Sequence, residues 1–170
     1  MVADRWELSQ VVRERAGVWR REAFLMCGDW ALAEDLVQTA LLRLHTRWQR
    51  IDPSGVDAYA RRVISRLAID ESRRPYRRAE LRADLPDAPV TGADQAGILD
   101  VRAALAKVPA RQRAVLVLRY FSDLTSTDVA KVLRISEGTV RSQAARGLTT
   151  LRQLLCEAAT AAETPEGSTR

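Results

Sequence analysis

The residues with the clearest chemistry in this chain are arginines, which gather in two short segments. Residues 59–82 carry eight Arg against three acidic residues, and residues 134–152 carry four Arg against one Glu. Their net charges are +5 and +3, whereas the rest of the 170-residue chain sums to −3. Because guanidinium groups neutralise phosphates, this distribution predicts two separate contacts with a polyanion.

Groups suited to catalysis or metal binding are sparse by comparison. His45 is the single histidine, and the two cysteines, Cys27 and Cys156, have no metal-ligand spacing. No phosphate-binding glycine loop or Ser-His-Asp order occurs, and the paired acids at 34–35 and 70–71 are predicted to lie on helix surfaces. The sequence therefore predicts no enzyme activity, no metal and no cofactor. Cys27 is predicted to be a small buried residue.

Composition predicts a folded protein that does not enter a membrane. Apolar residues make up 46% of the chain and charged residues 29%, so the chain has enough apolar residues to form a packed core. No stretch approaches about 18 uninterrupted apolar residues, and the opening MVADRWELSQ lacks a secretory pattern. We therefore expect a cytoplasmic protein with no membrane insertion.

The elements that position the arginines are predicted to be helices, because helical periodicity dominates and no alternating strand pattern occurs. Proline, glycine and capping residues predict helices over 5–27, 30–50, 56–74, 97–107, 109–121, 125–133 and 137–159. Thr125-x-x-Asp128 resembles a capping box, so Thr125 is predicted to cap the sixth of these helices. We expect an all-α fold with small helical domains over 1–81 and 97–159. A flexible linker over 82–96 and a tail over 160–170 complete the prediction.

The second basic segment has the pattern of a helix-turn-helix. A short apolar face precedes a tight turn at residues 134–136, and Ser136 is a suitable N-cap for the next helix. That helix buries a stripe at Val140, Ala144, Leu148, Leu151 and Leu155. Its other side carries Thr139, Ser142, Arg146 and Thr149, with Arg141 and Gln143 on the flanks. These small and basic side chains suit a helix that enters the major groove of DNA. The alternative interpretation is an ordinary amphipathic helix whose basic face is in contact with water only.

The first basic segment combines arginines with one aromatic ring. Its apolar positions are predicted to face inward, which leaves seven arginines outside. They are Arg61, Arg62, Arg66, Arg73, Arg74, Arg77 and Arg78, with Tyr76 among them. Guanidinium planes and an aromatic ring stack on unpaired bases. A membrane surface is the weaker alternative, because the apolar face lacks Trp and Phe.

One leucine on the helix at 30–50 lies outside the predicted core stripe, which consists of Ala33, Leu36, Val37, Ala40, Leu41, Leu44 and Trp48. Leu42 is surrounded by Asp35, Gln38 and Thr39 on the predicted outer face. A single exposed leucine is normal, but a leucine ringed by polar groups is also typical of a small protein-docking patch. Both interpretations stay open at this point.

Taken in order, these features resemble an extracytoplasmic-function (ECF) sigma factor of bacterial RNA polymerase over about residues 10–156. The first half is similar to the family's region 2 through Ala33-Glu34-Asp35-Leu36-Val37-Gln38 and the segment ending Arg73-Arg74-Pro75-Tyr76-Arg77-Arg78. The second half is similar to region 4 through Leu105-x-x-Val108-Pro109-x-x-Gln112-Arg113, Val117-Leu118-Arg119-Tyr120 and Glu137-Gly138-Thr139-Val140-Arg141-Ser142. The last stretch is most similar to short actinobacterial members.

The resemblance implies an alternative sigma factor that binds core RNA polymerase and directs promoter-specific transcription initiation. Region 2 would dock on the β′ clamp helices through Asp35, Gln38, Thr39 and Leu42. It would hold the minus-ten strand through Arg61, Arg62, Arg66, Arg73, Arg74, Tyr76, Arg77 and Arg78. Region 4 would sit on the β flap and contact the minus-thirty-five element through Thr139, Arg141, Ser142, Gln143 and Arg146. A flipped base costs a few kcal/mol, which stacking and phosphate contacts must offset.

Two positions depart from the family pattern. Leu67 stands where many members have Asn, and Gln143 stands where region 4 often has Arg. Both departures leave the promoter preference open, and Leu67 also leaves open how the minus-ten element is captured.

Other functions compete with this interpretation. A helix-turn-helix transcriptional regulator that is not a polymerase subunit shares the turn and second helix, but leaves residues 1–82 unexplained. A helical adaptor with merely solvated basic faces is the other alternative. The sequence also leaves open whether an anti-sigma factor clamps the two domains.

Overall fold

The computed structural model describes residues 2–74 and 95–162, all of its regular elements being helical. Most of the expected linker, together with Tyr76, Arg77 and Arg78, lies outside these ranges. The all-α prediction is confirmed. Within the described ranges, no helix is both long and apolar enough to cross a bilayer.

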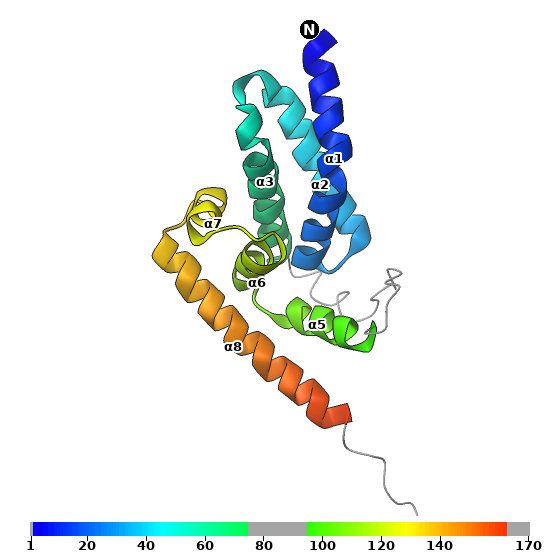
Figure 1. The fold of residues 1–170 in the computed structure, drawn as a ribbon. Coiled ribbons are helices and arrows are strands. Elements are labelled where there is room, and N and C mark those ends of the chain that lie inside the picture. The colour runs from blue at the N-terminus through cyan, green and yellow to red at the C-terminus, as the bar shows by residue number, and fades with distance from the viewer. Residues whose placement is uncertain (1, 75–94, 163–170) are drawn as a thin grey trace, which may run out of the picture.

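The first unit is a bundle of three helices, α1 (Val2–Cys27), α2 (Trp30–Arg47) and α3 (Val56–Glu71), which stand side by side in Figure 1. Gly28 allows the reversal between α1 and α2 because it adopts a left-handed φ of 78°. Asp29 then caps α2, since its carboxylate accepts a 2.9 Å hydrogen bond from the Leu32 amide. Short 3₁₀ turns, η1 (Trp48–Arg50) and η2 (Pro53–Gly55), lead into α3.

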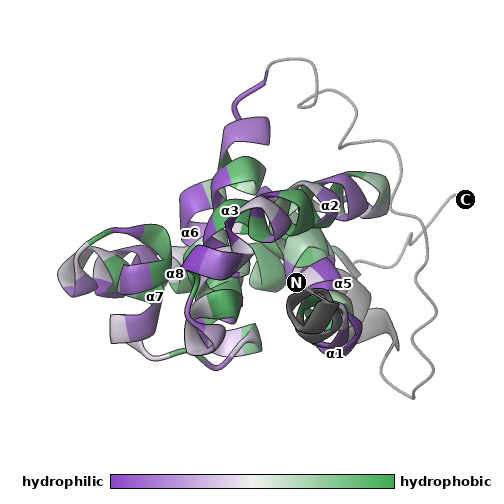
Figure 2. Ribbon diagram, turned by 90° about the horizontal axis from the view of Figure 1, so that it is seen from above, coloured by the Kyte–Doolittle hydropathy of each residue, from purple (hydrophilic) through white to green (hydrophobic). Residues whose placement is uncertain are grey.

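The core of this bundle confirms most of the predicted stripe on α2, although Leu41 and Trp48 are only half-buried. Leu36, Val37, Ala40 and Leu44 are buried, and hydrophobic residues face the space between the helices in Figure 2. Trp19 of α1 is fully buried, and its indole Nε1 donates a 3.0 Å hydrogen bond to Asp57 at the start of α3. This bond satisfies the one polar atom of the ring, so the large side chain can be buried without an unpaired donor.

The second unit contains the helices α5 (Gln95–Lys107), α6 (Ala110–Leu116), α7 (Ser126–Leu133) and α8 (Glu137–Ala162). Between α6 and α7, residues Val117–Phe121 form the single π-helical turn η3. Gly147 of α8 lies against α6, where an added Cβ would come within 3.0 Å of Leu116. The close approach of α6 and α8 therefore leaves little room for a side chain at this position, and a Cβ there would push against Leu116.

Local chemistry defines the helix-turn-helix formed by α7 and α8. The Thr125 hydroxyl accepts a 3.1 Å hydrogen bond from the Asp128 amide, and the Ser136 hydroxyl accepts one of 3.1 Å from the Thr139 amide. Both predicted N-caps are thereby confirmed. Between the helices, Arg134 adopts a left-handed φ of 56°, which ends α7 and turns the chain into α8.

Several helix ends differ from the prediction; α2 ends at Arg47 rather than 50, and α6 ends at Leu116 rather than 121. The third helix was expected to reach residue 74 but ends at Glu71, because the Ser72 hydroxyl donates a 2.6 Å hydrogen bond to the Ile69 carbonyl and Pro75 disfavours helix at the preceding residue. The last helix was expected to end near residue 159 but continues to Ala162. Residues 156–161 are exposed, and this end of the helix extends away from the rest of the molecule (Figure 1).

The two units pack against each other in this structure. Helix α3 lies along α7 and α6, while α1 lies against α5 and η3. The Arg102 guanidinium of α5 sits 5.7 Å from the centre of the Phe24 ring of α1. The sequence predicted two separate domains, and nothing in its periodicity indicated that α3 and α7 would be neighbours.

Candidate nucleic-acid interface

Arg61 is placed differently from the prediction that it would point outward. Its guanidinium is paired with the Glu22 carboxylate of α1, through Nε at 3.0 and 3.1 Å and through Nη2 at 2.8 Å. The side chain of Arg61 is 11% exposed and that of Glu22 is 1% exposed. Ser122 of the second unit donates a further 2.6 Å hydrogen bond to Glu22. Arg61 therefore supports the core of the fold in this arrangement and presents very little surface to DNA.

Arg62 connects the first unit to the helix-turn-helix. Its Nη2 donates a 3.0 Å hydrogen bond to the Lys131 carbonyl, and its Nε donates one of 3.3 Å to the Val132 carbonyl. These carbonyls belong to the last turn of α7, which has no intrahelical donors for them. A cation at a helix C-terminus is also favoured by the helix dipole. Arg62 thus caps α7 from across the boundary between the units.

The remaining described arginines of this segment are exposed. Arg66 is 3.9 Å from Asp70 on the same helix face, and Arg74 is 3.1 Å from Glu71. Arg73 is exposed, and no ion pair with another described residue is found for it. Such exposed pairs contribute little to stability, so these three guanidiniums are available to a phosphate.

The α8 residues predicted to contact DNA divide into two groups. Arg141, Ser142 and Arg146 are exposed to solvent on the outer side of the helix. Thr139 and Gln143 are half-buried and face α3. The two arginines on the outer face of α8 are therefore open to solvent, whereas Thr139 and Gln143 on its flank are partly covered by α3.

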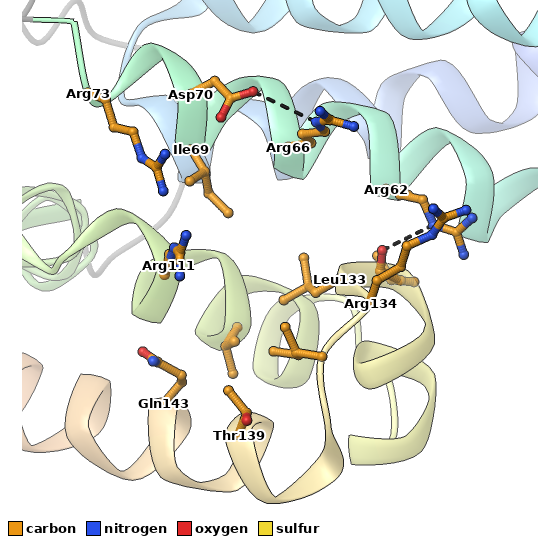
Figure 3. Close-up of a pocket in the computed structure, with 13 residues that line it drawn as sticks. Arg62, Arg66, Ile69, Asp70, Arg73, Arg111, Leu133, Arg134, Thr139 and Gln143 are labelled. Carbon is orange, nitrogen blue, oxygen red and sulfur yellow. Dashed lines mark hydrogen bonds and ion pairs between the residues drawn. The ribbon is translucent and has the colours of Figure 1, made fainter.

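A cavity of about 410 Å³ lies between α3 on one side and α6, α7 and α8 on the other (Figure 3). We call it the inter-unit cavity. It brings together Arg62, Arg66 and Arg73, predicted for the minus-ten strand, with Thr139 and Gln143, predicted for the minus-thirty-five duplex. Sequence reasoning missed Arg111 and Arg134, which also line it. Arg134 belongs to the second basic segment, but its place beside this cavity, like that of Arg111, follows from how the units pack.

A third arginine that the sequence did not indicate at this boundary is Arg113 of α6. It is 6% exposed, and its Nε atom has no hydrogen-bond partner within the described chain. Burial lowers the pKa of the Arg113 guanidinium, while its interaction with Cys27 of α1 acts in the opposite direction. A buried guanidinium stays charged at neutral pH and is costly to desolvate. Packing of the two units therefore gains free energy from apolar burial but loses some of it through desolvation of the Arg113 charge.

The predicted docking face on α2 is open. Leu42 is 68% exposed, and Asp35 and Gln38 are exposed beside it, whereas Thr39 is half-buried. A shallow groove of about 620 Å³ runs next to this face between α1 and α2. Leu8 and Val12 of α1 line the groove together with Leu41 and Leu42. The apolar spacing of Leu8 and Val12, one helical turn apart, was the signal that could have indicated it.

The two residues that depart from the family pattern have different surroundings. Leu67 is half-buried and packs against the hydrophobic core. Gln143 lines the inter-unit cavity. Among the residues that the structure describes, no group of three or more His, Cys, Asp or Glu side chains could hold a metal ion.

Family models match both halves of the chain. The model described as Sigma-70 region 2 matches residues 11–78, and the model described as Sigma-70, region 4 matches residues 98–151. Each match covers one of the two helical units, in the same order as the predicted regions.

Individual proteins show the same similarity. The RNA polymerase sigma-E factor of Streptomyces coelicolor is 34% identical over 155 residues, which cover 88% of this chain and 86% of that protein. The ECF RNA polymerase sigma factor SigL of Mycobacterium tuberculosis is 34% identical over 158 residues, covering 85% and 86% respectively. The sigma factor RpoE of Bartonella quintana, solved with the anti-sigma factor NepR, has a similar fold with a TM-score of 0.69 at 21% identity. That match covers 86% of this chain and 95% of the Bartonella chain.

Proposed function

The chain belongs to the ECF group of RNA polymerase sigma factors, and from that premise we propose how its two units share the recognition of a promoter. It is an alternative sigma factor, which binds core RNA polymerase and promoter DNA and directs transcription initiation. The observation that carries this function is the ordered pair of matches to regions 2 and 4, each on its own helical unit. The family is not known as an enzyme class, and we propose that the chain acts in the cytoplasm with no catalytic group of its own.

We propose that α8 contacts the minus-thirty-five element in the major groove. Arg141, Ser142 and Arg146 are exposed on its outer side, where small and basic side chains fit between the DNA backbones. Thr139 and Gln143 would join them once α3 no longer covers their flank. A contact of this kind requires a helix that is held rigidly. The Ser136 cap fixes the start of α8, and the packing of Gly147 against α6 fixes its middle.

We propose that the minus-ten strand is held by the exposed arginines of the first unit. Arg62, Arg66, Arg73 and Arg74 are the described members of this set, and Tyr76, Arg77 and Arg78 join it on the resemblance alone. Arg61 is left out, because its guanidinium is nearly buried against Glu22. Its proposed role is to fix α3 to α1, so that the neighbouring arginines are presented on a rigid helix.

Binding of both promoter elements requires the units to separate. Elements centred near positions minus ten and minus thirty-five are about 25 base pairs apart, which is roughly 85 Å along the duplex at 3.4 Å per step. In the free chain, residues proposed for the two elements line one cavity of about 410 Å³. Separation of the units would break the hydrogen bond from Arg62 to the Lys131 carbonyl, which costs free energy. It would also expose the buried Arg113 guanidinium to water, and this hydration would offset part of that cost.

We propose that the Leu42 face of α2 is the contact with the β′ clamp helices, while the second unit binds the β flap. Leu42→Asp is expected to weaken binding to core polymerase at least about tenfold, since a charge in a desolvated apolar contact is unfavourable. The change is made at a residue 68% exposed, so helicity by circular dichroism should be unchanged.

The matched control is Val101→Asp, which alters another exposed apolar residue outside this face. Affinity for core is measured by titration with a fluorescently labelled chain. If the Leu42→Asp variant and the unaltered chain bind core with equal affinity, Leu42 is not part of the contact with core polymerase.

Regulators that bind DNA without polymerase are not favoured, because they leave the match to region 2 unexplained. We also propose an anti-sigma factor as a partner, acting on the same two units. The Bartonella relative of similar fold was solved with such a factor.

A further inference from the structure

We propose that the inter-unit cavity binds a small anion carrying two or more phosphate groups, and that this anion holds the two units together. The cavity is lined by five arginines and a single acidic residue. They are Arg62, Arg66, Arg73, Arg111 and Arg134, with Asp70. The ligand is distinct from promoter DNA, which the same arginines of α3 are proposed to contact only after the units separate.

The charge balance of the cavity is the first argument. Five guanidiniums against one carboxylate leave four uncompensated positive charges around about 410 Å³. Like charges at such short range repel each other, and a partly enclosed space screens them less than open solvent does. A multivalent anion removes this repulsion, and guanidinium–phosphate contacts are among the strongest hydrogen bonds in proteins.

The direction of the side chains is the second argument. Figure 3 shows Arg73 of α3 and Arg111 of α6 extending into the space between the helices from opposite sides. Neither has an ion pair with another residue in the described part of the chain. Arg62 and Arg66 lie in the middle of α3, where the α7 carbonyls hold Arg62 and Asp70 pairs with Arg66. Both units therefore offer free guanidiniums to the same space.

The apolar wall gives the third argument, because it fits more than a bare phosphate chain. Ile69, Val115, Val132, Leu133 and Ile135 line the cavity beside the arginines. The hydroxyl of Thr139 and the amide of Gln143 add hydrogen-bonding groups at its edge. Volumes of a few hundred Å³ with apolar walls and a few polar groups are typical of small-molecule sites. A nucleoside diphosphate matches this combination, with its base on the apolar wall and its phosphates on the arginines.

Binding at this site would oppose DNA binding. The ligand contacts residues of both units and so stabilises their packing by mass action. It also occupies Arg62, Arg66 and Arg73, which are proposed to hold the minus-ten strand. Arg111 serves the cavity alone, since it belongs to neither proposed DNA contact. This difference separates the ligand site from the DNA interface in an experiment.

The test is calorimetric titration of the full chain with pyrophosphate and with ADP, two probes of equal phosphate number, at fixed ionic strength. Arg111→Ala is expected to weaken binding at least about tenfold, which is the order expected for one charge-assisted contact. Arg43→Ala, an exposed arginine on α2 outside the cavity, should leave it unchanged. Both variants should bind minus-thirty-five duplex like the unaltered chain.

Tighter binding of ADP than of pyrophosphate supports a nucleotide on the apolar wall, and equal binding supports an inorganic oligophosphate. The proposal is overturned if neither probe binds at millimolar concentration. It is equally overturned if Arg111→Ala and Arg43→Ala reduce affinity to the same extent, since the anion would then respond only to overall charge.

Discussion

Glu22→Ala is expected to lower the free energy of unfolding by about 3–5 kcal/mol, the loss typical of breaking a buried ion pair. Glu22 is 1% exposed and is bonded by Arg61 and by Ser122 of the other unit. Its removal leaves the Arg61 guanidinium nearly buried without an anion. The change should therefore weaken both the attachment of α3 to α1 and the packing between the units.

Urea unfolding followed by circular dichroism measures this loss, with Glu34→Ala as the matched control. Glu34 also pairs with an arginine, Arg20 at 2.7 Å, but the two side chains are 40% and 50% exposed. The exposed pair should contribute less than about 1 kcal/mol. The double variant Glu22→Leu with Arg61→Leu should recover part of the stability, since it removes the orphaned charge. Similar losses for Glu22→Ala and Glu34→Ala would contradict the structural role of this pair.

Arg146→Ala is expected to weaken binding to a minus-thirty-five duplex by about 1–3 kcal/mol, which is a loss of roughly 5- to 150-fold. Arg146 is exposed on the outer side of α8, in the part of that face which the first unit does not cover. If it contacts a base, the loss should be largest on the preferred sequence. If it contacts phosphate, the loss should be uniform across sequences, with a shallower dependence on salt.

The control for this prediction is Arg152→Ala, another exposed arginine two turns further along the same helix. Fluorescence anisotropy with labelled duplexes of different sequence at several salt concentrations distinguishes the two modes. Unchanged affinity of Arg146→Ala on every duplex would remove this residue from the interface.

Local chemistry made much of this fold predictable. Thr125 and Ser136 were predicted as caps because a hydroxyl three residues before a free amide is a local arrangement, and both hydrogen bonds are present. Leu42 was predicted to lie outside the core from helical periodicity alone, and it is 68% exposed. Features that depend on neighbours within one helical turn are thus visible in the sequence.

Contacts between distant residues were not predictable in the same way. The outward placement of Arg61 was wrong because its partner, Glu22, lies 39 residues earlier on another helix. The bond from Arg62 to the Lys131 carbonyl spans 69 residues and joins the two units. No periodic pattern encodes such pairs, so the inter-unit cavity and the roles of Arg111 and Arg134 emerged only from the structure.

A sigma factor must form a complex with core RNA polymerase that starts transcription at promoters, and reconstitution shows whether this chain does so. Purified chain is mixed with core polymerase, the mixture is separated by size exclusion, and the complex is assayed for transcripts on genomic DNA fragments. We predict that the chain co-elutes with core and yields transcripts from discrete start sites that core alone does not produce. Failure to co-elute under conditions in which a known sigma factor binds the same core would show that this chain is not a polymerase subunit.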